Sequence, residues 1–239
     1  MPSHFRCSEL SVSILQSPVP LLFLDTAALL DLLRARFRGD VQSDVVDSAI
    51  RILAGALDEP RRVWPVTSSN VVIELEEHRQ DVTAELDSSI RGMSSSIARM
   101  IEVARVLFPE RAFAPFEFAP NGFQDPVSMV LDRLVDATAV CQHTDACTLK
   151  AANRVRSGLP PSKPGKQEFK DCEIFECFLE LSAELRASGF EPAIVFVSPN
   201  KNDYGPPPDG FAAIANEIRS VNASYVANLS WARALLAGY

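Results

Sequence analysis

The stretch Val19-Pro20-Leu21-Leu22-Phe23-Leu24-Asp25-Thr26 decides the fold class. Its apolar part is short and unbroken and ends in a polar pair, which is typical of a strand buried on both faces of a sheet. Asp25 or Thr26 can cap a helix, and the leucines within residues 29–33 then recur with helical spacing. The local unit is therefore a buried strand, a sharp turn and a helix.

Short apolar runs and helical patterns alternate along the rest of the chain. Further strands are expected at Val63–Val66, where Pro65 confines the strand to an edge or a strand end, at Ala193–Val197 and at Tyr225–Ala227. Helical patterns are expected from Ser68 or Ser69 onward and over about 43–57, 81–107, 127–140, 147–155, 171–186 and 211–218. Short strands separated by helices predict an α/β fold with a mainly parallel sheet.

We expect a single domain over residues 1–239. The strand signals fall within about 15–80 and 168–239, which we assign to the sheet core. Residues from about 81 to 156 are almost entirely helical in pattern, and we interpret them as a helical insertion on the sheet domain. The clearest helix of this insertion, over 81–107, repeats apolar residues every three or four positions.

Composition excludes several classes of protein. No apolar stretch approaches the roughly 18 residues of a membrane span. With 23 basic against 31 acidic residues, the net charge of −8 argues against a protein that coats DNA by neutralising its phosphates. Five cysteines without a CxxC pair, and without a secretory signal, predict reduced thiols and a cytoplasmic protein.

Oxygen-bearing side chains follow the predicted strands or open the helices after them. They are Asp25, Glu74, Asp171, Asn200 and Asp203. Because ligands bind outside the carboxyl ends of strands in an open parallel sheet, these side chains converge at one edge if the strands are neighbours. Clustered carboxylates repel each other unless cations lie between them, and Mg²⁺ or Mn²⁺ prefers such oxygen ligands. The pattern predicts metal-assisted cleavage of a phosphodiester.

Four short blocks, in this order, resemble the signature of the PIN-domain nucleases. The blocks are Leu22–Thr26, Val72–His78, Phe169–Asp171 and Val195–Tyr204. The chain is most similar to a PIN-like subgroup whose third block follows a loop of Lys, Gly and Pro, here residues 160–166. The resemblance implies a three-layer α/β/α fold and cleavage of RNA, less often of DNA, that depends on a divalent metal.

The resemblance also implies roles for single residues. Asp25, Glu74 and Asp171 match the acidic metal-binding positions, and Asp203 matches the acid before the last aromatic residue. These four are the expected catalytic residues and, with Asn200, the expected metal ligands. Asn200 stands where many members have a fourth Asp, and its amide oxygen can ligate a cation but brings no charge. A second metal site should therefore be weakened.

A basic stretch precedes Asp171. From Lys150 to Lys170, six Lys or Arg residues stand against a single acid, Glu168. We interpret this stretch either as a solvated helix face and loop or as a phosphate-binding surface. On the second interpretation the nucleic-acid contacts are Lys163, Lys166 and Lys170, together with Thr26 and Ser198.

Several alternatives stay open. Taken alone, Asp25 and Asp171 fit helix caps, and Asp203 fits a turn. The chain as a whole fits a metal-dependent endoribonuclease, another phosphoester hydrolase, or a weak or inactive PIN-like module that binds nucleic acid or protein. An interaction protein built on the helical third would instead expose an apolar stripe on residues 81–107. The expected partners are RNA or DNA, with a protein inhibitor or a second copy as further candidates, and no membrane.

Overall fold

The computed structural model describes residues 3–113, 121–165 and 168–236, with the backbone alone over 121–125. Within these ranges six strands form one sheet, and every pairing between neighbouring strands is parallel. In spatial order the strands are β1 (Ser3–Arg6), β4 (Ala139–Gln142), β3 (Trp64–Ser68), β2 (Leu21–Leu24), β5 (Ile194–Val197) and β6 (Ser224–Val226). The predicted parallel sheet is confirmed.

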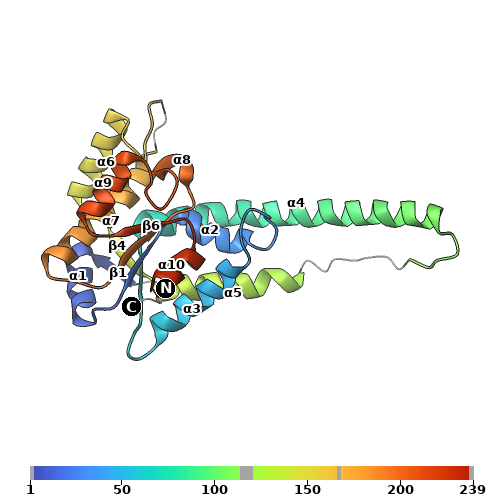
Figure 1. The fold of residues 1–239 in the computed structure, drawn as a ribbon, viewed down its shortest axis with the longest axis horizontal. Coiled ribbons are helices and arrows are strands. Elements are labelled where there is room, and N and C mark those ends of the chain that lie inside the picture. The colour runs from blue at the N-terminus through green and yellow to red at the C-terminus, as the bar shows by residue number, and fades with distance from the viewer. Residues whose placement is uncertain (1–2, 114–120, 166–167, 237–239) are drawn as a thin grey trace.

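Helices cover both faces of the sheet (Figure 1). One face carries α1 (Cys7–Gln16), α6 (Asp145–Ser157), α7 (Phe169–Ala187) and α9 (Ala212–Ser220). The other face carries α2 (Thr26–Arg34), α3 (Asp44–Leu57), α5 (Asn121–Ala137), α10 (Leu229–Leu236) and the start of α4 (Ser69–Leu107). A single turn, α8 (Lys201–Tyr204), follows β5. The predicted three-layer α/β/α fold is confirmed.

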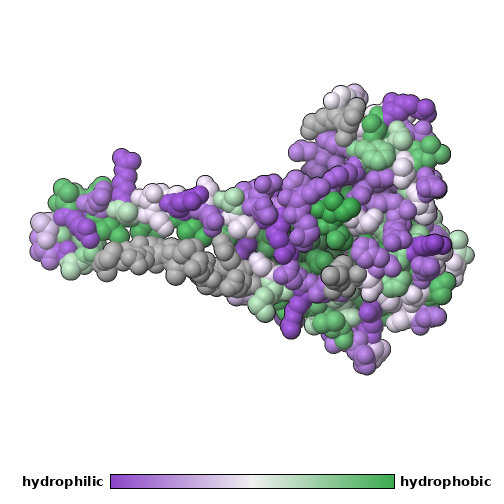
Figure 2. Space-filling view, turned by 180° about the vertical axis from the view of Figure 1, so that it is seen from behind, coloured by the Kyte–Doolittle hydropathy of each residue, from purple (hydrophilic) through white to green (hydrophobic). Residues whose placement is uncertain are grey.

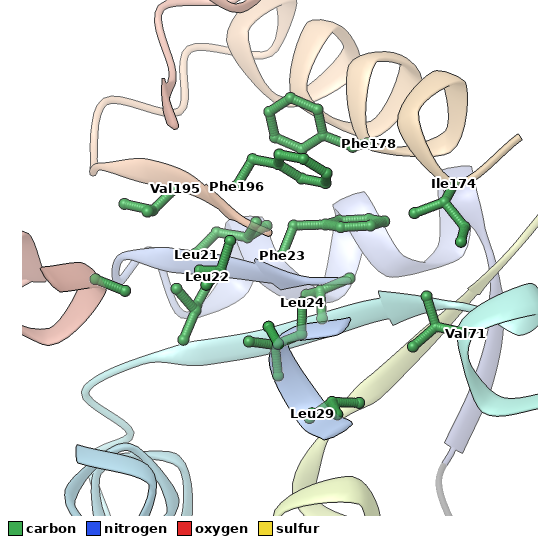
Figure 3. Packing of buried hydrophobic residues seen from close by; sticks show 14 of the residues in the cluster. Leu21, Leu22, Phe23, Leu24, Leu29, Val71, Ile174, Phe178, Val195 and Phe196 are labelled. Carbon is green, nitrogen blue, oxygen red and sulfur yellow. The ribbon is translucent and has the colours of Figure 1, made fainter. Parts of the chain in front are cut away.

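The strand β2 lies at the centre of the sheet, between β3 and β5. Each of its four residues is at most 1% exposed, because helices cover both of its faces. The rings of Phe23, Phe178 and Phe196 pack together with centroids 4.9 to 6.2 Å apart (Figure 3). Burial of such rings is a major source of stability, so the apolar run that predicts the strand also forms the centre of the core.

Pro65 lies in β3, which is an interior strand of the sheet. It stands opposite Leu22 of β2, whereas the pairing of β3 with β4 begins only at Val66. The missing N–H of the proline therefore falls at the end of the strand, where no β4 residue is opposite. The expectation that Pro65 occupies a strand end is confirmed.

The expected helical insertion over about 81–156 needs a correction, because residues 139–142 form β4 within the sheet. The helix expected over 127–140 ends at Ala137. The apolar run of β4 is too short to signal a strand in the sequence, although its first three residues are at most 5% exposed. The edge strand β1 is also absent from the sequence prediction, since its residues Ser-His-Phe-Arg are mostly polar.

The helix α4 runs for 39 residues and joins two helices that the sequence patterns separate. Its first half packs on the body of the molecule, and Ile90 is the last buried residue along it. Beyond Ile90 it projects as an arm (Figures 1 and 2). Exposed fractions of 43–81% are found on the arm for Met93, Met100, Val103, Val106 and Leu107. The interaction-protein alternative predicts an exposed apolar stripe over residues 81–107. Val82, Leu86 and Ile90 are buried, so the exposed part of the stripe begins beyond Ile90.

Long as α4 is, neither it nor any other helix of the described ranges is apolar enough over sufficient length to cross a membrane. Charged and serine residues separate the exposed apolar side chains of α4 over 91–107.

Two leucines of α4 allow a matched test of the arm. Leu86 is 3% exposed and Leu107 is 65% exposed. Leu86→Ala should lower the free energy of unfolding by about 2–5 kcal/mol, because it opens a cavity in a packed site. Leu107→Ala should change it by less than about 0.5 kcal/mol, because little packing is removed. Urea denaturation measures both values, and equal losses would mean that the arm is packed in solution.

Candidate metal site

Neighbouring strands deliver acidic side chains to one edge of the sheet. Asp25 directly follows β2, Glu74 lies on α4 after β3, and Asp203 lies on α8 after β5. Because β3, β2 and β5 are adjacent and parallel, these residues all come from the carboxyl edge. The helix α7 leads back to the start of β5, so its first turn, with Asp171, lies at the same edge.

Asp25 is only 2% exposed, and both of its carboxylate oxygens accept hydrogen bonds. The backbone N–H of Thr26 donates to Oδ1 at 2.9 Å, which is the helix-capping contact that the sequence alone suggests. The hydroxyl of Ser198 donates to Oδ2 at 2.6 Å from the neighbouring strand end. These two bonds fix the direction of the carboxylate.

The hydroxyl groups of Thr26 and Ser198 both contact acids. Thr26 Oγ1 donates to Glu74 Oε2 at 2.6 Å, so the first and second sequence blocks meet directly. Ser198 is fully buried and its hydroxyl holds Asp25, and its expected contact with nucleic acid stays a prediction. Thr26 is 6% exposed, and its contact with nucleic acid stays a prediction.

Three carboxyl groups form an acidic cluster within the described part of the chain. Oxygen atoms of Glu168, Asp171 and Asp203 all lie within 4.8 Å of one another. Glu168 is the residue that the sequence blocks do not include, because it stands out in the sequence only as the single acid of the basic stretch. Its position three residues before Asp171 is the available signal, since residues at that spacing lie on one face of a helix start.

Asp203 is held by two nitrogen atoms. The amide nitrogen of Asn200 donates to its Oδ2, and Lys163 Nζ lies 2.9 Å from its Oδ1. The side chain of Asn200 therefore serves Asp203 in this arrangement, and ligation of a metal by Asn200 stays a prediction. Lys170 lies further out and pairs with the exposed Glu77 at 2.9 Å. Lys166 lies outside the described residues.

A family model described as PIN domain matches residues 22–204. The chain belongs to the PIN-domain family. The match contains all four sequence blocks and every acid of the site. Neither a curated protein nor a solved structure matches the chain. Membership indicates a nuclease-type fold, and PIN nucleases generally use divalent metals and act on nucleic acid.

The charges of this PIN domain's acids act on one another. Burial raises the pKa of Asp25 to about 7, and the charges of Glu74 and Asp203 raise it too, although the bonds from Ser198 and Thr26 oppose them. Burial also raises the pKa of Asp171 to about 8, with further increases from Asp25, Glu74, Asp203 and Glu168. The five acids therefore form one electrostatic unit, and the shared metal site that the sequence blocks imply for four of them stays a prediction.

The donor set of the PIN domain fits a hard divalent cation. Its side chains are carboxylates, which Mg²⁺ and Mn²⁺ prefer, and three of them converge within ligating reach of one point. The raised pKa values of Asp25 and Asp171 have burial and mutual repulsion as their causes. A bound cation relieves that repulsion, because it supplies the largest local positive charge.

The raised pKa values predict how stability depends on pH when a chelator keeps the site free of metal. Burial raises the pKa of Asp25 to about 7 and that of Asp171 to about 8 in the folded state, from an ordinary pKa of 3.8. Since the folded state binds more protons than the unfolded one, the free energy of unfolding should fall as pH rises from about 4 to about 8. Thermal unfolding in EDTA at pH 5 and pH 8 measures this slope.

Asp25→Asn and Asp171→Asn should each flatten that slope, whereas Asp145→Asn, which changes an exposed acid of α6, should leave it as it is. At pH 8, Mn²⁺ should raise the unfolding midpoint of the wild type more than that of Asp171→Asn, because ligands stabilise the state that binds them. Stability that rises with pH over this window in EDTA would contradict the electrostatic description.

Proposed function

We propose that this PIN domain is a metal-dependent endoribonuclease that hydrolyses RNA phosphodiester bonds with Mg²⁺ or Mn²⁺. One observation carries the proposal: oxygen atoms of Glu168, Asp171 and Asp203 lie within 4.8 Å of one another at the carboxyl edge of the sheet. Asp25 and Glu74 belong to the same electrostatic unit. A cytoplasmic location is part of the proposal, since all five cysteines are free thiols.

The acids divide into two groups by their surroundings. Glu168, Asp171 and Asp203 would hold the cation, because their oxygen atoms are closest together. When bound, the cation supplies Lewis-acid stabilisation of charge that develops on the phosphate. Asp25 and Glu74 are each oriented by a hydroxyl donor, which fixes where their remaining lone pairs point.

A carboxylate that is fixed in direction can orient an attacking water and accept its proton. Glu74 suits that role, because Thr26 holds only Oε2 and the side chain is half-buried rather than enclosed. Asp25 has both oxygens engaged and is almost completely buried, which suits a residue that sets the charge of the site. The reaction that follows is hydrolysis, in which the water oxygen attacks phosphorus and the opposite P–O bond breaks.

Two partly exposed lysines lie beside the acids. Lys163 is 34% exposed and touches Asp203, and Lys170 is 48% exposed beside Glu77. Lys170 can move from its exposed pair to a phosphate, because exposed ion pairs contribute little stability. Lys163 is partly exposed, and its partner Asp203 is buried. We propose these two lysines, together with Lys166, as the contacts that lead an RNA strand to the acids.

The central test replaces single acids. Asp171→Asn should lower the rate of cleavage of a fluorescent single-stranded RNA in Mn²⁺ by at least about a hundredfold, since the substitution removes a ligand and a charge from the site. Asp25→Asn should do the same, and Asp145→Asn should retain wild-type activity. Single-stranded DNA of the same sequence, assayed in parallel, shows whether RNA is preferred.

The same variants separate the nuclease from the alternative of a weak or inactive binding module. Calorimetric titration with Mn²⁺ should detect a site in the wild type that is absent from Asp171→Asn. A binding module has no Mn²⁺ site that depends on Asp25 and Asp171. A folded protein without such a site, and without cleavage, would support the module and exclude the nuclease.

The lysines have a test of their own. The double variant Lys163→Gln/Lys170→Gln should raise KM for RNA. It should also reduce the slope of log KM against log salt by about 0.7 for each phosphate that a lysine no longer neutralises. Arg133→Gln, which removes an exposed charge of α5 on the other helical layer, is the control. An unchanged salt slope in the double variant would leave these lysines as part of a solvated surface.

A further inference from the structure

A cavity lies at the opposite end of the sheet from the acids. It has a volume of about 1300 Å³ and is lined by the segments that lead into three strands: Pro18–Pro20 before β2, Arg61–Val63 before β3, and Gly189–Pro192 before β5. The ends of α3 and α10 complete its wall. Neither Asp25 nor any other acid of the metal site lines it, so it is a separate feature of the molecule.

The floor of this amino-end cavity is apolar. Its apolar lining comes from Leu15, Val19, Ile52, Val63, Phe190 and Leu236. The cavity is larger than the roughly 300–1,000 Å³ of a typical small-molecule site. An inorganic anion alone would fill a small part of it, and an apolar floor gives such an anion nothing to bind. The size and the lining of the cavity therefore favour an organic ligand with an apolar body.

Arginines are concentrated around the cavity, although the chain as a whole carries a net charge of −8. Four arginines line it, Arg51, Arg61, Arg62 and Arg233, against one acid, Glu191. Three of these arginines have carboxylate partners nearby. Asp47 lies 2.9 Å from Arg51 and 3.6 Å from Arg233, and Asp58 lies 2.5 Å from Arg62.

Arg61 differs from the other three. Its guanidinium carbon lies 3.8 Å from the ring centre of Trp64, so the two groups are stacked. Among the residues that the structure describes, no carboxylate pairs with it, and burial lowers its pKa. A half-buried, stacked guanidinium without a counter-charge is a site that an anion can complete, because charge-assisted hydrogen bonds are strongest where water is partly excluded.

We propose that the amino-end cavity binds a nucleoside phosphate. Arg61 and Arg62 contact the phosphates, and the base lies against the apolar lining of the cavity. The proposal is independent of the nuclease site, since the two lie at opposite ends of the strands. The proposed ligand is chemically similar to the monomers of RNA, the proposed substrate of the acidic site.

Isothermal titration with ATP in EDTA tests the proposal, because the chelator removes any binding that needs metal at the acids. The wild type should bind ATP, and Arg61→Gln should weaken the affinity at least about tenfold. Arg62→Gln should also weaken the affinity for ATP. It should change the free energy of unfolding little, because the Arg62 side chain is exposed. Asp25→Asn should bind ATP like the wild type.

The matched control is Arg111→Gln. The guanidinium of Arg111 also lies over an aromatic ring, 5.3 Å from the centre of Phe108, but Arg111 follows the end of α4 and lies outside the cavity. Its variant should bind ATP like the wild type. Failure of the wild type to bind ATP at millimolar concentration, or equal affinity of wild type, Arg61→Gln and Arg62→Gln, would overturn the proposal. Tripolyphosphate that binds as tightly as ATP would overturn recognition of the base.

Discussion

The carboxyl group of Asp25 is buried at the end of the central strand β2, and the geometry of the acidic site depends on its position. Behind the acids, Phe175, Phe196 and Tyr204 pack with ring centroids 5.1 to 5.7 Å apart. This apolar layer removes water from one side of the carboxyl groups, which is the first cause of the raised pKa of Asp25. Burial of a charge costs free energy, and the aromatic packing of the same layer offsets that cost.

The position of Asp203 depends on the turn that follows it. Gly205 has a φ of 85°, and a Cβ atom there would lie 2.2 Å from the backbone nitrogen of Phe211. Only glycine fits such a position. The hydroxyl of Tyr225 lies within hydrogen-bonding distance of the backbone oxygens of Gly205 and Ser198, at 3.2 and 3.1 Å. β6 thus fixes both ends of the segment that carries Asp203.

Much of this arrangement could be predicted from sequence, because its main signals are local. The apolar run before Asp25 predicts a buried strand, and an acid at a strand end predicts the edge where ligands bind. The sequence does not indicate which residue each polar group contacts. The bonds from Ser198 to Asp25 and from Thr26 to Glu74 join segments 173 and 48 residues apart. Strand β4 is absent from the prediction for a related reason. Its burial comes from its pairing with β1 and β3, and a run of three apolar residues does not by itself indicate a strand.

The basic stretch shows how one run of charges can serve different purposes. Arg154 is 5% exposed, and its guanidinium binds Glu176 at 2.5 Å, Glu217 at 2.6 Å and the backbone oxygen of Pro160 at 2.6 Å. It therefore belongs to the interior, where removal of one partner from such a network is costly. Its bond to Pro160 anchors the loop that carries Lys163.

Lys163 in turn places a positive charge on Asp203. Clustered acids repel one another unless a positive charge lies nearby. Lys163 supplies that charge to one carboxylate, whereas a divalent cation would supply it to the whole cluster. Arg154 and Lys163 thus act together. Arg154 fixes the loop, and Lys163 on that loop brings its charge to the acids. The stretch is accordingly neither a uniform solvated face nor a uniform phosphate-binding surface.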